Sequence, residues 1–378
     1  MHFHNARQHF AVGSRNRRRP RCLAKRFHSA LIRVLPVRES PSIPVLTDRL
    51  QRPLRDLRIS VTDRCNFRCT YCMPRDVFGP GHEFLDRNDL LSFEEITRLA
   101  AVFVSLGTRK IRLTGGEPLL RRDLEKLVSQ LHATVPQTEL TLTTNGSLLA
   151  RKAAPLRESG LSRITVSLDA LDDNTFQRMN DAGVPVAQIL EGIEAALAAG
   201  FNPVKINAVI RRGINEHAIS QMADRFSGPQ YVVRFIEYMD VGNTNGWRLR
   251  DVLPASGIAA HLELSGGPLK RLPARDAGEV AHRYRTAAGG EIGIISSVTQ
   301  PFCQNCNRAR LSSEGRLFTC LFGSAGLDLR EPLRAGAGNE ELAGLISRAW
   351  AARDDRYSEL RTAAGQGRAK VEMSAIGG

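Results

Sequence analysis

The sequence lacks any apolar run long enough to cross a bilayer, so a membrane protein is not expected. It also lacks a secretory signal and an even number of cysteines, since only seven are present. Disulfide pairing is therefore a poor explanation of these cysteines, and reduced thiols that hold metal in the cytoplasm are expected instead. Basic and aromatic residues do not alternate in the body of the chain, which argues against specific nucleic-acid binding.

Acidic residues are nearly absent from the first part of the chain, where most of the net charge of +14 lies. Residues 1–40 hold ten Lys and Arg residues and one acid, Glu39, a balance of +9. We predict that residues 1–45 form a disordered basic extension. A stretch upstream of the translation start, an organelle transit peptide and a nucleic-acid-binding arm are the alternatives.

Beyond residue 50, short β-rich runs alternate with helical stretches, and the length of 378 residues favours two domains. Strands are predicted at Leu57–Thr62, Lys110–Thr114, Glu139–Thr144, Arg163–Leu168, Val204–Ile210 and Tyr231–Tyr238. Helices are predicted at Ser92–Leu106, Arg122–His132, Ala187–Ala199 and Glu216–Phe226, the first with a capping box formed by Ser92 and Glu95. Six βα units favour an α/β fold with a parallel sheet curled into a full or partial TIM-like barrel.

Polar clusters follow five of these strands. They are the cysteines after residue 64, Gly115–Pro118, Thr143–Gly146, Ser167–Asp169 and Glu237–Met239. Since the carboxyl ends of parallel strands meet at one rim of a barrel, we expect the active site there. After about residue 250, short segments at Val280–Thr286, Gly290–Ile295, Arg310–Leu311 and Leu317–Cys320 predict a smaller β-rich region followed by helix.

Six cysteines form two groups of three, which leaves only Cys22 without a group. The first group is Cys65-x3-Cys69-x2-Cys72, a spacing that suits an iron–sulfur cluster with one open iron. The second is Cys303-x2-Cys306-x13-Cys320. Zinc is the alternative for the second group, although no histidine or fourth cysteine lies between residues 297 and 330.

The first group, with Tyr71 before its last cysteine, resembles the signature of the radical S-adenosylmethionine (SAM) superfamily. The stretches Leu57–Pro74, Lys110–Pro118, Pro301–Leu311 and the terminal Ile376-Gly377-Gly378 are similar to the GTP 3′,8-cyclase family, over about residue 46 to the last residue. This resemblance implies a radical SAM core barrel at 46–250 and an auxiliary-cluster and GTP-binding region at 251–378.

The resemblance also implies residue roles. A SAM-binding [4Fe–4S] cluster is expected on Cys65, Cys69 and Cys72, and a second [4Fe–4S] cluster, facing GTP, on Cys303, Cys306 and Cys320. The SAM site is expected to contain Tyr71, Gly116, Ser167 and Met239. GTP is expected to bind Arg58, Arg112, Thr143, Lys205, Arg308, Ala309 and Arg310. Catalytic roles are expected for Arg308, Arg310, Gly377 and Gly378.

The residues themselves support the GTP site, because arginine binds phosphate oxygens bidentately and a cation in an apolar strand needs an anion or a lumen. By resemblance, a 5′-deoxyadenosyl radical takes the 3′ hydrogen of GTP, and C3′ attacks C8 to give 3′,8-cyclo-7,8-dihydro-GTP, the first step of molybdenum cofactor biosynthesis.

Expected partners are a flavodoxin or ferredoxin reductant, a downstream cyclic pyranopterin synthase and a second copy of the chain in a homodimer. The alternatives are another radical SAM enzyme, such as a peptide maturase, and a zinc-bound nucleic-acid-binding protein.

Overall fold

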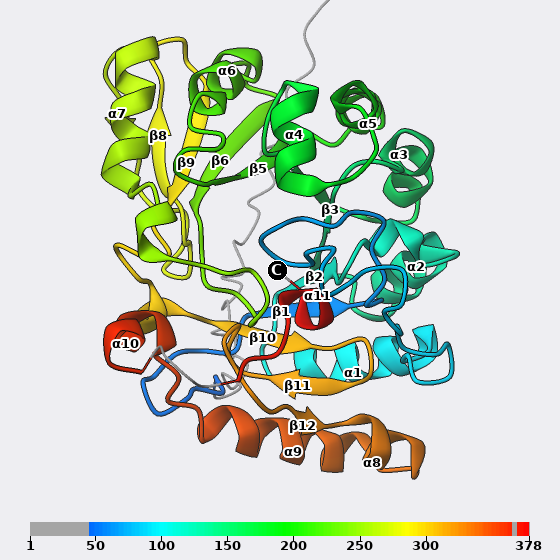
Figure 1. Ribbon diagram of the computed structural model, residues 1–378. Coiled ribbons are helices and arrows are strands. Elements are labelled where there is room, and N and C mark those ends of the chain that lie inside the picture. The colour runs from blue at the N-terminus through cyan, green and yellow to red at the C-terminus, as the bar shows by residue number, and fades with distance from the viewer. Residues whose placement is uncertain (1–44, 365–368, 378) are drawn as a thin grey trace, which may run out of the picture. The chain divides into compact units, whose positions relative to one another are not determined.

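The computed structural model describes residues 45–364 and 369–377. The expected extension up to residue 44, Cys22 and Gly378 lie outside this part of the chain. Six parallel strands run side by side in chain order (Figure 1): β1 (Asp56–Ser60), β2 (Lys110–Thr114), β3 (Glu139–Thr144), β4 (Arg163–Ser167), β5 (Val204–Ile210) and β6 (Tyr231–Glu237).

Helices connect these strands: α1 (Phe93–Ser105), α2 (Leu124–Thr134), α3 (Leu149–Glu158), α4 (Asp173–Asn180), α5 (Val186–Ala198) and α6 (Ala218–Arg225). The capping box is confirmed at α1, where Ser92 accepts from the Glu95 amide and the Glu95 carboxylate accepts from the Ser92 amide. The helices α3 and α4 were not among the predicted helices. Pro155 inside α3 removes a backbone donor and obscures the helical pattern.

The region after residue 250 adds strands to both edges of this sheet. At the β6 edge lie β9 (Glu291–Ile295), which is parallel to β6, then β8 (His282–Arg285) and β7 (Lys270–Arg271). At the β1 edge lie β10 (Arg308–Leu311), which is parallel to β1, then β11 (Arg316–Phe318) and β12 (Leu327–Asp328). The order β12-β11-β10-β1-β2-β3-β4-β5-β6-β9-β8-β7 has two free ends, so the predicted partial barrel is confirmed.

The remaining helices follow this sheet: α7 (Ala255–Gly266), α8 (Arg330–Arg334), α9 (Asn339–Ala351), α10 (Tyr357–Ala364) and α11 (Met373–Ile376). Short 3-10 turns are η1 (Pro118–Leu120), η2 (Leu249–Asp251) and η3 (Cys303–Asn305). In Figure 1, α8 and α9 run beside β11 and β12, and the red helix α11 lies at β1, which it contacts. None of the described helices has the length and apolar character needed to cross a membrane.

Alternation along the strands gives the sheet one apolar face and one polar face. In β5, Val204, Ile206 and Ala208 are fully buried, while Lys205 and Asn207 between them are half-buried. The same period places Leu57 and Ile59 of β1 in the hydrophobic core and Arg58 on the opposite face. The helices cover the apolar face, so the polar residues point into the curl of the sheet.

Candidate active site

A cavity of about 290 Å³ lies on the polar face of the sheet. Its lining includes both cysteine groups and four of the predicted GTP-binding cations, Arg58, Arg112, Arg308 and Arg310. The predicted residues Tyr71, Gly116, Thr143, Ser167 and Met239 line it as well. The structure therefore brings into one cavity residues from Arg58 to Ser374, which lie 316 positions apart in the sequence.

The first cysteine group lies on the loop between β1 and α1. A turn closes it, because the amides of Cys72 and Met73 both donate to the Cys69 carbonyl, at 3.2 and 2.9 Å. The Phe67 amide donates to Cys65 Sγ at 3.4 Å, and Asn180 Nδ2 donates to Cys69 Sγ at 3.3 Å. Such N–H···S contacts are typical of cysteines that ligate iron–sulfur clusters, whose sulfurs carry negative charge.

The pKa values of the thiols on this loop fit the binding of a positively charged group. Burial and the neighbouring Cys69 raise the pKa of the Cys65 thiol above its usual range. The pKa of Cys72 is also raised, by a hydrogen bond with Cys69, by burial and by the other thiols. Since thiolates are the ligating form, three of them at this loop would need a positively charged partner, which a metal cluster would supply.

Gly116 and the buried carboxylate of Glu117 shape the cavity wall beside this loop. A Cβ at Gly116 would lie 2.2 Å from the Arg64 carbonyl, so only glycine allows the cysteine loop to approach so closely. Glu117 is buried and accepts from Thr144 Oγ1 at 2.7 Å, from the Asn145 amide at 2.7 Å and from the Leu119 amide at 3.0 Å. It thus ties the end of β2 to the end of β3. Burial raises its pKa to about 7.

Tyr71 and Asp169 form a second buried polar contact at the rim. Tyr71 donates to Asp169 Oδ2 at 2.9 Å, and Asn180 Nδ2 donates to the same oxygen at 3.0 Å. The other carboxylate oxygen accepts from the Val209 amide at 2.8 Å. Burial raises the pKa of Asp169. The Oδ1 atom of Asn180, a residue of the cavity lining, is buried without a partner among the described residues, so it is an acceptor available to a ligand.

The second cysteine group is held from behind by a buried ion network. Asp48 Oδ2 pairs with Arg52 at 2.6 Å and with Arg353 at 3.0 Å, and all three side chains are at most 2% exposed. Arg52 Nη1 donates to the Cys303 carbonyl at 2.8 Å, and Arg353 Nη1 donates to the Cys306 carbonyl at 2.7 Å. This network therefore fixes the backbone of Cys303 and Cys306, two of the three cysteines of the group.

The thiols of the second group differ in acidity. Although burial opposes it, the positive charges of Arg308 and Arg353 lower the pKa of Cys306 to about 6. Burial and the negative charge of Asp355 raise the pKa of Cys320 to about 11. Within the described residues, no group of three or more His, Cys, Asp or Glu is spaced to hold a single metal ion.

Cations outnumber acids in the cavity. The parallel register puts Arg58 of β1 between Arg310 of β10 and Arg112 of β2. Burial and the charge of Arg310 lower the pKa of Arg58, whereas Arg112 is hydrogen-bonded to Thr143 at 2.9 Å and to Thr165 at 3.3 Å. An excess of buried positive charge is costly unless an anion neutralises it, so the cavity fits a polyanionic ligand.

Sequence reasoning missed one cation of this set, Arg234 of β6. It lines the cavity, and within the described residues it makes no hydrogen bond or ion pair. Burial and the charge of Arg112 lower its pKa to about 9. The strand pattern contained the signal, since Arg234 lies between the buried Val233 and Phe235 on the alternate face, as Lys205 does in β5.

Two of the predicted GTP-binding residues are not in the cavity lining. Ala309 is fully buried in the hydrophobic core, so its side chain points to the other face of β10. Lys205 lies on the polar face but is not among the lining residues. Burial, followed by the charge of Arg234, lowers its pKa to about 6.

The C-terminal segment reaches the cavity. Met373 and Ser374 of α11 line it, and Arg310 donates a hydrogen bond to the Gly377 carbonyl. Gly377 has a φ of +73°, and a Cβ there would lie 2.1 Å from Thr114 Cγ2. Both the backbone conformation and the space therefore require glycine at this position.

Family models and curated relatives place this chain in the same family. The model of the Radical SAM superfamily matches residues 59–226, and the model described as Molybdenum Cofactor Synthesis C matches residues 231–359. A GTP 3′,8-cyclase of Acidothermus cellulolyticus is 52% identical over 88% of this chain and 99% of its own length. GTP 3′,8-cyclases of Staphylococcus epidermidis and Xanthomonas axonopodis pv. citri are 46% and 48% identical over the same shares. Among solved structures, Streptococcus suis SuiB bound to S-adenosylmethionine is 18% identical, with a TM-score of 0.44 over 56% of this chain and 47% of that chain.

Proposed function

The chain belongs to the GTP 3′,8-cyclase family of radical SAM enzymes, and we propose that its two cysteine groups hold SAM and GTP at opposite sides of one cavity. The predicted activity is confirmed by this membership: the chain is a radical SAM enzyme that acts in the first step of molybdenum cofactor biosynthesis. Relatives of this kind do not support the peptide-maturase alternative. The observation that carries the proposed arrangement is that both groups line a cavity rich in arginine.

The first group, Cys65, Cys69 and Cys72, would hold the [4Fe–4S] cluster that the radical SAM family requires. When bound, this cluster supplies the electron that cleaves SAM and starts the radical reaction. Around it, the Tyr71–Asp169 contact and the Gly116 turn shape the SAM site, with Ser167 and Met239 as further lining residues. We propose a second [4Fe–4S] cluster on Cys303, Cys306 and Cys320.

The arginines would bind GTP. Arg58, Arg112 and Arg234 lie on neighbouring parts of the polar face, where guanidinium groups can neutralise a triphosphate. Thr143, bonded to Arg112, fixes the orientation of that guanidinium. Arg308 and Arg310 stand between these residues and the second cysteine group, where they would orient the guanine and the reacting ribose.

The tail residues Gly377 and Gly378 would complete the site, with Gly377 held against Arg310. We further infer a division at residue 250 between the SAM-binding core and the GTP-binding region, although their strands share one sheet. The remaining proposals follow from the reaction class: a flavodoxin or ferredoxin as reductant, transfer of the product to a cyclic pyranopterin synthase, a homodimer and a reducing, cytoplasmic location.

The test is an anaerobic assay of the reconstituted protein with dithionite, SAM and GTP. Mass spectrometry follows 5′-deoxyadenosine and the cyclised nucleotide. Formation of both supports the proposal. Cleavage of SAM while GTP stays unchanged would contradict the GTP site, and peptide substrates would then be tried.

Replacing Arg234 by Met should weaken GTP binding by about ten- to a hundredfold, because a hydrogen bond to a charged group contributes about 1.5–3 kcal/mol. The same change should raise the melting temperature without GTP, since it removes a buried cation that has no acidic partner in the described structure. Calorimetry with GTP and thermal unfolding measure the two effects. The control is Arg225→Met at the surface pair with Glu194. A lower melting temperature with unchanged GTP affinity would contradict the assignment.

Binding of GTP should take up a proton at Lys205. In the folded chain its pKa is about 6, and in an unfolded chain a lysine has a pKa of about 10.4. Between about pH 6 and pH 10, an unfolded chain keeps the Lys205 proton that the folded chain has lost. Without GTP, Lys205 therefore disfavours folding below about pH 10, and the free energy of unfolding rises with pH from about 6 to 10. A triphosphate nearby raises the folded pKa, so binding weakens as the pH rises above 6. Calorimetry in two buffers of different ionisation enthalpy measures the uptake, which Lys205→Met should abolish.

A further inference from the structure

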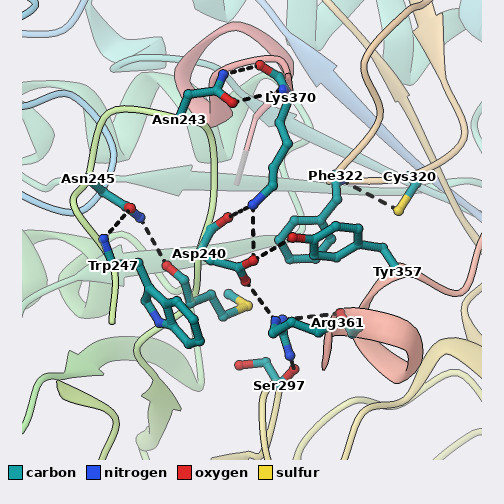
Figure 2. Close-up of polar contacts among 12 residues, drawn as sticks. Asp240, Asn243, Asn245, Trp247, Ser297, Cys320, Phe322, Tyr357, Arg361 and Lys370 are labelled. Carbon is teal, nitrogen blue, oxygen red and sulfur yellow. Dashed lines mark hydrogen bonds and ion pairs between the residues drawn. The ribbon is translucent and has the colours of Figure 1, made fainter. Parts of the chain in front are cut away.

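Polar contacts hold the C-terminal segment at the loop that follows β6. The strongest of them involve Lys370 and Asp240 (Figure 2). Lys370 Nζ lies 3.0 Å from Asp240 Oδ2 and donates to the Asp240 carbonyl at 2.6 Å. The two side chains are 9% and 10% exposed, so the pair is largely shielded from water. The ammonium also lies 4.9 Å from the ring centre of Tyr357, which stacks on Phe322.

Asn243 binds the backbone of the same segment. Its Oδ1 accepts from the Lys370 amide at 2.9 Å, and its Nδ2 donates to the Lys370 carbonyl, so one side chain satisfies both backbone groups. Figure 2 shows these two parallel contacts. On the other side, the Val371 amide donates to the Gly323 carbonyl at 3.0 Å, in the loop after Cys320.

Glu372 is a residue of the C-terminal segment whose side chain accepts hydrogen bonds from the loop after β6. Its carboxylate accepts from the Asn243 amide at 2.9 Å and from Thr244 Oγ1 at 3.2 Å. Gly242 makes room for it, because a Cβ at this position would lie 2.0 Å from Glu372 Oε2. The φ of Gly242 is +63°, which also favours glycine.

The loop that makes these contacts also borders the proposed SAM site. Asp240 directly follows Met239, and Asn245 Nδ2 donates to the carbonyls of Met239 and Tyr71, at 3.0 and 3.3 Å. The helix α11 (Met373–Ile376) begins directly after Glu372, the last contact residue, and Gly377 at its end then meets Arg310. The contacts therefore hold the segment that leads into α11 and to the contact between Gly377 and Arg310.

We propose that Asp240, Asn243, Lys370 and Glu372 form a tail clamp, a set of positioning residues that holds Gly377 at Arg310 of the cavity. The inference rests on the proposed function, because the target of the tail is the proposed GTP site. Within the described residues, the clamp residues make no hydrogen bond or ion pair with either cysteine group or with the arginines that line the cavity. We therefore expect them to act on the site through the tail.

Two variants test the clamp with little risk to folding. Asn243 is exposed, and all hydrogen bonds of its side chain within the described residues go to the tail, so Asn243→Ala removes only tail contacts. Lys370→Met replaces the ammonium group over the Phe322 ring by an apolar chain of similar length, and Asp240 keeps its contacts with Tyr357 and Arg361. The matched control is Asn88→Ala, an exposed asparagine whose side chain makes no hydrogen bond in the described part of the chain.

The first measurement is release of the C-terminal residues by a carboxypeptidase, followed by intact-mass spectrometry of the reconstituted full chain. Lys370→Met loses a hydrogen bond between charged groups, and Asn243→Ala loses two neutral hydrogen bonds to the Lys370 backbone. Either loss changes a population by about tenfold, so both variants should release the tail about ten times faster than the wild type. Asn88→Ala should match the wild type. Equal release from all four proteins would overturn the clamp.

The second measurement is the yield of cyclised GTP per SAM cleaved. It should fall in Asn243→Ala and Lys370→Met, and Lys370→Arg, which keeps a charged donor, should restore it. The two readouts separate the hypotheses. Faster tail release in the variants, together with a wild type that does not cyclise GTP, would support the clamp and reject the proposed function. Wild-type cyclisation with no difference in tail release would reject the clamp alone.

Discussion

Replacement of Cys72 by Ala is expected to abolish SAM cleavage and GTP cyclisation together, by at least about a thousandfold, because a cluster with two thiolate ligands is not retained in a form that can reduce SAM. Iron in the reconstituted protein should fall by about half, since only the second group would still hold a cluster. Product assays and iron analysis on the same preparation measure both effects.

The matched variant is Cys303→Ala in the second group. It should lose about the same share of iron and still form 5′-deoxyadenosine from SAM, while the cyclised nucleotide disappears. This difference between the groups follows from their separate backbones, one on the loop after β1 and one before β10. If Cys303→Ala lost SAM cleavage to the same extent as Cys72→Ala, the proposed division of roles between the two groups would be wrong.

Replacement of Asp48 by Asn should lower the free energy of unfolding by about 3–5 kcal/mol. The variant leaves the buried guanidinium groups of Arg52 and Arg353 without their shared counter-charge, and removing one partner of a buried ion network has this cost. Because both arginines donate to carbonyls of the second cysteine group, the variant should also lose iron from that group first. Urea unfolding and iron analysis after dialysis measure the two effects.

A neighbouring surface pair provides the control for Asp48. Arg49 and Asp354 are 3.7 Å apart, with side chains 65% and 71% exposed, so Asp354→Asn should change the stability by less than about 1 kcal/mol. A similar small effect of both substitutions would show that the buried network does not stabilise the fold.

Local patterns were sufficient for much of the fold. The strands β2, β3 and β5 begin and end where the sequence predicts, and the capping box of α1 is formed by the predicted residues. Alternation and capping act over a few residues, so they can be read from a short window. The missed helices α3 and α4 lack such a clear pattern. In α4, the buried residues are Thr175, Phe176, Met179 and Asn180, of which two are polar.

The candidate site could be predicted where its chemistry is concentrated in short motifs. Both cysteine groups, the Gly115-Gly116-Glu117 turn and the terminal glycines stand out by spacing and composition. Arg234 and Asp48 do not, because their meaning depends on their surroundings. Arg234 is unusual only once its burial and lack of a partner are known, and the contact of Asp48 with Arg353 spans 305 residues.

The sequence by itself determined the six parallel strands, the two cysteine groups and the kind of chemistry they carry, since each of these is encoded by neighbouring residues. Only the tertiary structure decided that β9 and β10 extend the two edges of one sheet and thereby bring both groups to one cavity. It also decided that Lys370 pairs with Asp240 rather than with another acid. Such pairings depend on which distant segments are packed together, and that is set by the burial of the whole chain rather than by any local pattern.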